Sequence, residues 1–293
     1  MKIKIIVDSS SGLSQQEAQN LGWDLIPLNA EIDGKPYKIG INLDVDEFAR
    51  MWRSNKKINT STFATPPGVS QEVIDKYIDN YDKIIIYSIS KELSSQNSSL
   101  ITLFKDNPKV HVVESKKISY LIVRDLLLFE QKINNGVSFD KAIEHFNQKN
   151  EKLLLVPQFN DALVKGGRLS KAAAMIAKLA KIVPIIRFEN GILEKEGLGR
   201  VFTKTLDKLV KELFEKLPKE NENYYLVIPH ADNDEIEKII NSFKLVTNNY
   251  PRIASIKLPA DISVHTGIGA VCVSFAEIKD EIKDKFLSIA KVW

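Results

Sequence analysis

The sequence predicts an α/β protein of two domains, with an N-terminal parallel sheet covered by helices and a C-terminal mixed α/β domain. The chain has 293 residues, which is long for one domain, and its 44% hydrophobic and 27% charged residues are typical of a globular protein. Over the first half, apolar strand-like runs alternate with helical segments, which indicates a parallel sheet. The pattern changes after Asn150. We therefore expect domains at 1–152 and 153–293.

Local signals justify the elements of the first half. Ser14 and Glu17 have the spacing of a capping box at a helix start. Asp33-Gly34 is a hairpin-type turn signal. An apolar helix is expected over Ile118–Ile133, and further helices after Asp44 and near Ser95. Strands are expected at Ile3–Val7, Leu25–Ile32, Lys83–Ile89 and Val110–Val113.

The second half combines hairpin and helix signals. Glu189-Asn190-Gly191 predicts a hairpin turn between two strands. Helices are expected at Thr203–Leu217, at Glu235–Phe243 and, as an amphipathic segment, between Glu277 and Trp293. Further strands are expected at Leu153–Val156, Tyr225–Ile228, Ile253–Leu258 and Val271–Phe275. A single cysteine, Cys272, lies between valines and is expected to be buried.

Composition excludes several classes of function. Lysine and arginine exceed aspartate and glutamate by 41 − 38 = 3, and the basic residues are scattered, so nucleic acid is not an expected partner. One cysteine excludes an internal disulfide, and the four histidines show no metal-ligand spacing. No apolar stretch approaches the roughly 20 residues of a membrane span, and the N-terminal apolar run is too short for a signal peptide. We therefore expect a cytoplasmic protein that uses no metal.

The candidate site is built from neutral hydrogen-bond donors. His265 and Thr266 lie beside Gly267 and Gly269, between two strand-like runs, and we expect the histidine at a strand edge. Upstream, Thr60-Ser61-Thr62 lies in a polar loop from Asn55 to Gly68. Ser94-Ser95 lies where a helix begins. Each hydroxyl cluster alone fits turn and capping chemistry, whereas together they suit a carboxylate or a phosphate.

The motifs resemble those of the DegV family of bacterial fatty-acid-binding proteins, which includes the acyl-carrying subunits of fatty acid kinase. The matching segments run through the whole chain: Val7-Asp8-Ser9-Ser10, Thr60-Ser61, Ser90-x-x-Leu93-Ser94, Glu114-Ser115, Lys165-Gly166-Gly167-Arg168-Leu169-Ser170, Val183-Pro184-Ile185-Ile186 and His265-Thr266-Gly267-x-Gly269-Ala270. The Gly-Gly-Arg-Leu-Ser and His-Thr-Gly blocks in this order are specific to that family.

The resemblance implies a non-catalytic lipid carrier without a cofactor. A long-chain fatty acid would occupy a buried tunnel between the two domains and present its carboxylate to a partner kinase, which forms an acyl phosphate for phospholipid synthesis. The carboxylate would be held by Thr60, with Ser61 or Thr62, by Ser94 and by His265, with Thr266 beside it. Arg168 and Arg200 are implied in the partner surface or the head-group network.

Two departures and two alternatives accompany this reading. Thr62 replaces the family's usual glutamine, and the segment Lys91–Gln96 lacks both glycines of the Ser-Gly-Leu-Ser-Gly-Thr pattern. The alternative function is an enzyme acting on a small acid or acyl ester, with His265 as general base. The Ala-rich helix expected at Lys171–Lys181 is either an ordinary amphipathic helix or a lid that opens at a transient membrane surface.

Overall fold

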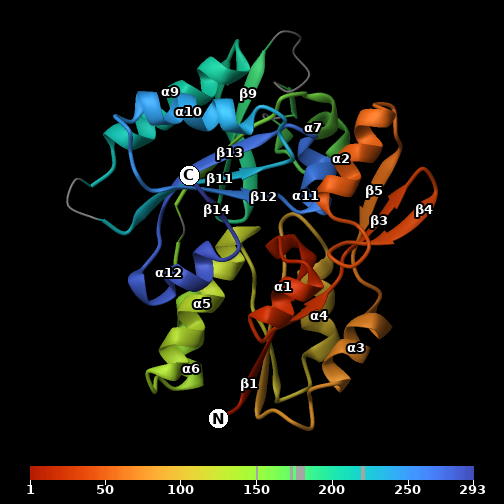
Figure 1. Ribbon diagram of the computed structural model, residues 1–293. Helices are drawn as coiled ribbons and strands as arrows, with labels where there is room; N and C mark the ends of the chain where they lie inside the picture. The colour runs from red at the N-terminus through yellow and green to blue at the C-terminus, as the bar shows by residue number, and fades with distance from the viewer. Residues whose placement is uncertain (150, 172–173, 176–181, 219–221) are drawn as a thin grey trace. The chain divides into compact units, whose positions relative to one another are not determined.

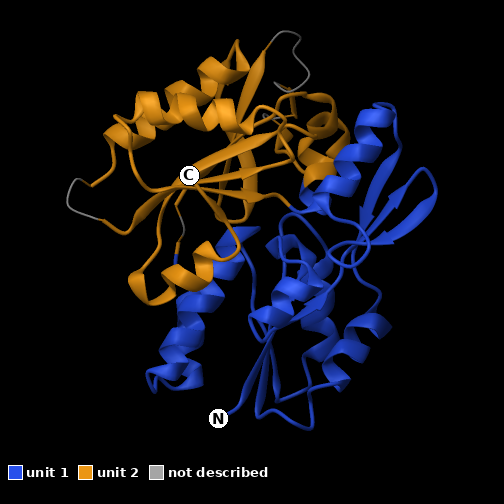
Figure 2. Ribbon diagram, viewed as in Figure 1, with its two compact units in different colours: residues 1–148, 259–262 blue, residues 149–258, 263–293 orange. Residues whose placement is uncertain are grey.

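A computed structural model describes residues 1–149, 151–171, 174–175, 182–218 and 222–293, drawn as ribbons in Figure 1. The chain separates into two compact units, Met1–Gln148 with Pro259–Ile262 and Lys149–Leu258 with Ser263–Trp293 (Figure 2). The α/β class predicted from the sequence is confirmed. The domain limits at residue 152 stay a prediction, and nothing in the sequence pattern indicates that Pro259–Ile262 groups with the first unit.

The first unit contains a four-stranded parallel sheet in the order β2-β1-β6-β7. The strands are β1 (Ile3–Asp8), β2 (Asp24–Ile26), β6 (Lys83–Tyr87) and β7 (Val110–Val112). The helices of this unit are α1 (Gln15–Asn20), α2 (Val45–Ser54), α3 (Pro67–Asp75), α4 (Gln96–Phe104), α5 (Tyr120–Asn134) and α6 (Phe139–Ile143). Short 3₁₀ turns, η1 (Ser9–Ser11) and η2 (Glu144–Asn147), follow β1 and α6. This is the parallel sheet that the strand–helix alternation predicts.

The pleat of this sheet divides its side chains between two apolar layers. Ile6, Ile84 and Ile86 pack in one buried cluster with residues of α3 and α4. Tyr87 points to the opposite face, because successive strand residues alternate, and its ring contacts Phe146 of η2 at 5.0 Å between centroids. The central strand β6 is therefore buried on both faces, as its β-branched sequence predicts.

A second, antiparallel sheet of three strands has the order β4-β3-β5. Its strands are β3 (Asn29–Ile32), β4 (Lys35–Lys38) and β5 (Thr60–Phe63). Asp33 and Gly34 both have positive φ, which confirms the predicted hairpin turn. The loop predicted at Thr60–Thr62 is wrong, because these residues form β5, pairing Thr60 with Ile32 and Thr62 with Ala30. The four residues of β5 carry no apolar alternation, so pairing with β3 rather than local pattern makes them a strand.

The second unit is built on a seven-stranded mixed sheet in the order β10-β9-β8-β13-β11-β12-β14. Its strands are β8 (Leu153–Val156), β9 (Val183–Glu189), β10 (Ile192–Gly199), β11 (Tyr224–His230), β12 (Ile253–Lys257), β13 (Val271–Glu277) and β14 (Lys291–Val292). Its helices are α7 (Asp161–Gly166), α9 (Phe202–Glu215), α10 (Ile236–Val246) and α12 (Asp280–Leu287), and it shares α11 (Ala260–Thr266) with the first unit. The β9–β10 hairpin turns at Asn190 and Gly191, both with positive φ, as predicted.

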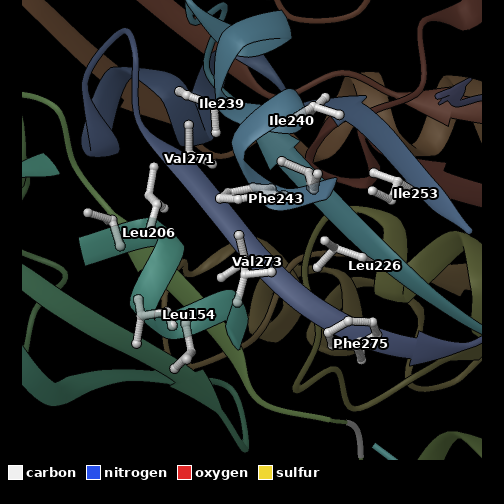
Figure 3. Packing of buried hydrophobic residues seen from close by; sticks show 14 of the residues in the cluster. Leu154, Leu206, Leu226, Ile239, Ile240, Phe243, Ile253, Val271, Val273 and Phe275 are labelled. Carbon is white, nitrogen blue, oxygen red and sulfur yellow. The ribbon is translucent and has the colours of Figure 1, made fainter. Parts of the chain in front are cut away.

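One face of this sheet carries the core of the second unit. Figure 3 shows Val271, Val273 and Phe275 along β13, with Leu206 of α9 and Phe243 of α10 among the side chains that pack against them. The i, i+2 spacing on β13 meets the helical spacing on α9 and α10, so both periodicities serve one apolar layer. On the opposite side of the β13 pleat, Cys272 is buried as predicted.

The end of the chain forms a strand that the sequence did not predict. The predicted amphipathic helix is present as α12, and β14 follows it. β14 pairs antiparallel with β12, and the indole of Trp293 donates a hydrogen bond to Ser255 Oγ at 2.9 Å. In Figure 1 this places the C-terminal strand beside β12 at one edge of the sheet. β10, at the other edge, has a register shift between Lys195 and Gly197.

The helix predicted at Lys171–Lys181 and the expected absence of a membrane span both concern helices. The Ala-rich segment Lys171–Lys181 falls mostly on residues outside the described part of the chain. None of the helices that the structure describes is long and apolar enough to cross a membrane.

Candidate functional site

The hydroxyl clusters of the first unit are linked through a pair of residues that the sequence did not single out. Thr65 N–H donates to Gln96 Oε1 at 2.8 Å, and Gln96 Nε2 donates back to Thr65 Oγ1 at 3.1 Å. The Thr65 hydroxyl donates in turn to the Pro27 carbonyl at 2.7 Å. Both residues are buried. The segment after β5 is thereby joined to the start of α4.

Ser94 belongs to the same network. Its Oγ accepts the Gln96 N–H at 3.2 Å, and the side chain is only partly buried. A hydroxyl that accepts a hydrogen bond keeps its own proton to donate, so Ser94 can still serve a carboxylate. Thr60, Ser61 and Thr62 are also partly exposed along β5. No sequence motif indicated Thr65, because a threonine after a short strand is an ordinary turn residue.

A pair of buried carboxyl groups lies at the carboxyl end of β1. Asp8 Oδ1 accepts hydrogen bonds from the Ser10 N–H at 3.2 Å and hydroxyl at 2.5 Å, and Oδ2 accepts the Ile89 N–H at 2.8 Å. Burial raises the pKa of Asp8 to about 6, although these hydrogen bonds oppose the shift. Burial, together with the charge of Asp8, raises the pKa of Asp261 to about 8. Asp261 is therefore largely protonated at neutral pH.

His265 lies in the last turn of α11, not at a strand edge as the sequence analysis expected. The flanking glycines suggested extended chain, but the seven residues Ala260–Thr266 form a helix. Gly267, with a φ of +84°, ends this helix as a left-handed C-terminal residue, so the glycine marks a helix end and not a strand edge. Burial, helped by the charge of Arg168, lowers the pKa of His265 to about 4. The imidazole is therefore neutral at pH 7 and carries one N–H donor.

The Gly-Gly-Arg block packs against this histidine within the second unit. A Cβ at Gly166 would lie 3.0 Å from Nδ1 of His265, so any other residue there would require the imidazole to shift by a few tenths of an ångström. Arg168 is exposed, and its guanidinium donates to the Gly166 carbonyl at 2.7 Å. Arg168 is thus close enough to His265 for its charge to lower the pKa of the imidazole. Arg200 lies on an exposed bend after β10.

Two residues that the sequence did not indicate contact the His-Thr-Gly-x-Gly block at Gly269, namely Asn233 and Gln158. Asn233 Nδ2 donates to the Gly269 carbonyl at 2.5 Å, and a Cβ at Gly269 would lie 1.8 Å from Gln158 Oε1. Thr266 Oγ1 is buried and has no hydrogen-bond partner among the described residues. A buried hydroxyl without a partner is costly, so this atom is a candidate ligand contact.

The available chemistry is that of neutral donors. Hydroxyl groups and a neutral imidazole can hold an anion by hydrogen bonds. Over the described residues, no group of three or more histidine, cysteine, aspartate or glutamate side chains is arranged to hold a metal ion.

Fold and sheet order define an α/β protein made of a parallel-sheet unit and a mixed-sheet unit. Residues 2–277 match the family model described as "Uncharacterised protein, DegV family". A DegV domain-containing protein of Mycoplasmopsis pulmonis is 43% identical over 290 residues, which cover 98% of this chain and 99% of that protein. The chain therefore belongs to the DegV family, which confirms the resemblance inferred from its motifs.

Solved structures share the fold. A DegV family protein from Thermus thermophilus, described by its fatty acid binding, superposes with a TM-score of 0.80 at 20% identity and covers 94% of this chain and 100% of its own. A stearic acid-binding protein from Eubacterium ventriosum superposes with a TM-score of 0.82 at 19% identity, covering 98% and 99%.

Proposed function

We propose that this protein binds a long-chain fatty acid and acts as a non-catalytic acyl carrier. The two solved proteins compared above are described as fatty acid-binding, and this chain shares their fold. The Thermus thermophilus protein is also described as a member of the DegV family, to which this chain belongs. The acid's carboxylate would be held by Thr60, with Ser61 or Thr62 as neighbours, by Ser94, and by His265 with Thr266. The observation that carries the proposal is the buried Thr266 hydroxyl, which lacks a partner in the described chain and lies next to a neutral imidazole.

The energetics fit a division of labour between tail and head group. Burying an acyl chain contributes on the order of 0.8 kcal/mol per methylene, so about 16 carbons contribute roughly 10 kcal/mol before losses. A carboxylate removed from water needs donors to offset its desolvation. In this proposal the tail supplies the affinity, and the hydroxyl groups with His265 fix the orientation of the acid.

Organic extraction of the purified protein followed by mass spectrometry tests the proposal. We expect a fatty acid in stoichiometric amount, and the delipidated protein should bind palmitate again. Ser94→Ala should weaken this binding by about 1.5–3 kcal/mol, the value of a charge-assisted hydrogen bond. An extract without fatty acid and a delipidated protein that ignores palmitate would refute the carrier function.

The partner in this proposal is a kinase that phosphorylates the presented carboxylate to an acyl phosphate, in the service of phospholipid synthesis. Exposed Arg168 and Arg200 suit contacts with a nucleotide-binding partner or with the charged head group. Incubation of the loaded protein with a candidate kinase and ATP should produce acyl phosphate, trapped as a hydroxamate. Loss of that product in Arg168→Ala, with palmitate binding intact, would assign Arg168 to the partner surface.

The enzyme alternative gains no support from the site electrostatics. A histidine with a pKa of about 4 is a weak general base at pH 7, since catalytic bases work best with a pKa near the operating pH. Turnover of a p-nitrophenyl acyl ester that disappears in His265→Ala would nevertheless favour the enzyme over the carrier.

A further inference from the structure

A buried ion pair of the first unit involves none of the proposed donors. Lys117 Nζ contacts Asp125 Oδ2 of α5, and their side chains are 3% and 2% exposed. The Tyr87 hydroxyl donates to the same carboxylate at 3.3 Å, and His145 Nε2 lies 3.8 Å from Asp125 Oδ1. Apolar side chains in place of such a pair are often as stable or more stable. Stability alone therefore does not account for a charged pair here.

Lys117 is connected to the Ser94 loop through its backbone. The Lys117 carbonyl accepts the Ser90 N–H at 2.9 Å, where the chain leaves β6. The Ser90 carbonyl accepts the Ser94 N–H at 3.3 Å. Lys117 of the ion pair is thus hydrogen-bonded to Ser90 in the loop between β6 and α4, and Ser90 is hydrogen-bonded to Ser94.

A second connection runs beside the first. Lys117 N–H donates to Ser115 Oγ at 3.2 Å, and the Ser115 carbonyl accepts the Lys91 N–H at 3.1 Å. The segment from Ser115 to Lys117 therefore holds two successive residues of the loop, Ser90 and Lys91. The ion pair between the Lys117 side chain and Asp125 of α5 fixes the position of this segment. Fixing a donor in advance lowers the ordering cost of binding.

We propose that Lys117 is a positioning residue for the carboxylate site: its ion pair with Asp125 fixes the backbone that presents Ser94 to the acid. This inference rests on the proposed function, because it assigns a purpose to the geometry of Ser94. The residue acts through hydrogen bonds of the backbone and does not touch the ligand.

Amide hydrogen exchange of the ligand-free protein tests the anchor without any fatty acid. In the double variant Lys117→Met with Asp125→Leu, the Ser90 and Ser94 amides should exchange about tenfold faster. The melting temperature should fall by no more than the loss of one buried hydrogen bond, that of the Tyr87 hydroxyl to Asp125, accounts for. The matched control is Lys91→Gln with Glu114→Gln, which removes an exposed ion pair of the same loop and should leave both amides unchanged. Unchanged protection of Ser94 in the double variant overturns the proposal.

Palmitate binding then tests whether the ion pair positions Ser94 for the carboxylate. The double variant should bind palmitate about tenfold more weakly, as expected for one impaired charge-assisted hydrogen bond. The single variant Lys117→Arg, which keeps a cation beside Asp125, should retain most of the wild-type affinity. In a Ser94→Ala background the double variant should cause no further loss. An equal loss in both backgrounds overturns the proposal, since Lys117 would then act independently of Ser94.

Two other outcomes remain decisive. If the double variant does not fold, Lys117→Gln with Asp125→Asn removes both charges while keeping polar groups of similar shape, and the same two measurements apply to it. If the wild-type protein binds no palmitate, the proposed function fails, and the exchange of the Ser94 amide still decides whether the ion pair anchors the loop.

Discussion

Gly166 lies so close to the imidazole of His265 that a Cβ there would come within 3.0 Å of Nδ1 and 3.3 Å of the histidine Cβ. Both residues belong to the second unit, although almost a hundred positions separate them in the sequence. The contact gives the first glycine of the Gly-Gly-Arg block a physical role, because a side chain there would press against the imidazole.

Gly166→Ala should displace the imidazole and weaken palmitate binding by about tenfold, the loss of one hydrogen bond to a charged group. Isothermal titration calorimetry measures the affinity, and the NMR shifts of the His265 ring report its displacement. The control is Gly167→Ala. Gly167 has a φ of +67° and no atom near its missing Cβ, so alanine there costs roughly 1 kcal/mol of stability through backbone strain alone. Equal binding losses in the two variants would contradict a specific role for the Gly166–His265 contact.

Thr266→Val should leave the ligand-free protein as stable or more stable by about 1 kcal/mol, because it removes a buried hydroxyl that has no partner in the described chain. The same change should weaken palmitate binding. Thermal unfolding with and without palmitate separates the two effects. Thr205→Val is the matched control, because the Thr205 hydroxyl donates to the Val201 carbonyl at 2.7 Å. Removing this hydroxyl should lower the stability of the protein and leave palmitate binding unchanged. A Thr266→Val variant that loses stability without ligand would show that the hydroxyl has a structural partner.

Asp261→Asn should stabilise the protein increasingly as the pH rises. The pKa of Asp261 is about 8 in the folded state against 3.8 for the ordinary side chain, so the folded state holds a proton that the unfolded state releases. Asp261 therefore lowers the free energy of unfolding as the pH rises from about 4 to about 8. Asparagine does not ionise, so the variant lacks this decrease. Urea unfolding at pH 5 and pH 8 should give a variant-minus-wild-type difference at least about 1 kcal/mol larger at pH 8.

The comparison cancels the opposite contribution of the histidines. Burial lowers the pKa of His145 and His265, so their effect on stability rises with pH up to about 6.5 in both proteins. The control Asp106→Asn alters an exposed carboxylate and should give a flat difference. A flat difference for Asp261→Asn as well would mean that Asp261 is ionised in the folded protein.

Ser119→Gly should stabilise the protein by about 1 kcal/mol. Ser119 has a φ of +54° and ψ of −143°, a conformation that glycine adopts readily and other residues adopt at a cost of order 1–3 kcal/mol. Its hydroxyl is buried without a partner among the described residues, so little is lost with the side chain. Urea unfolding measures the gain. Ser119→Ala keeps the strain and should gain less, and equal stabilities for the two variants would argue against strain at this position.

The sequence predicts the elements whose signals are local. The Ser14–Glu17 capping box, the Asp33-Gly34 turn and the buried strand β6 each follow from a few neighbouring residues. The motifs likewise identify the family before any fold is seen. Local chemistry was sufficient in these cases because each signal and its structure lie within one short segment.

What the sequence did not predict depends on partners far along the chain. Thr60–Thr62 forms a strand only because β3 lies beside it, and His265 lies on a helix where flanking glycines suggested a strand edge. The Thr65–Gln96 pair joins residues 31 positions apart, and neither type is unusual where it occurs. The assignment of the carboxylate donors remains a prediction that the binding experiments decide.

The short strand β14 has a consequence for handling the protein. By pairing with β12 it occupies main-chain groups that would otherwise be open to a strand from a neighbouring molecule. At the far side of the sheet, the irregularity between Lys195 and Gly197 makes β10 a poor template for the same event. Expression variants shortened before Lys291 would uncover the β12 edge, and concentrated samples of them would be prone to intermolecular sheet growth.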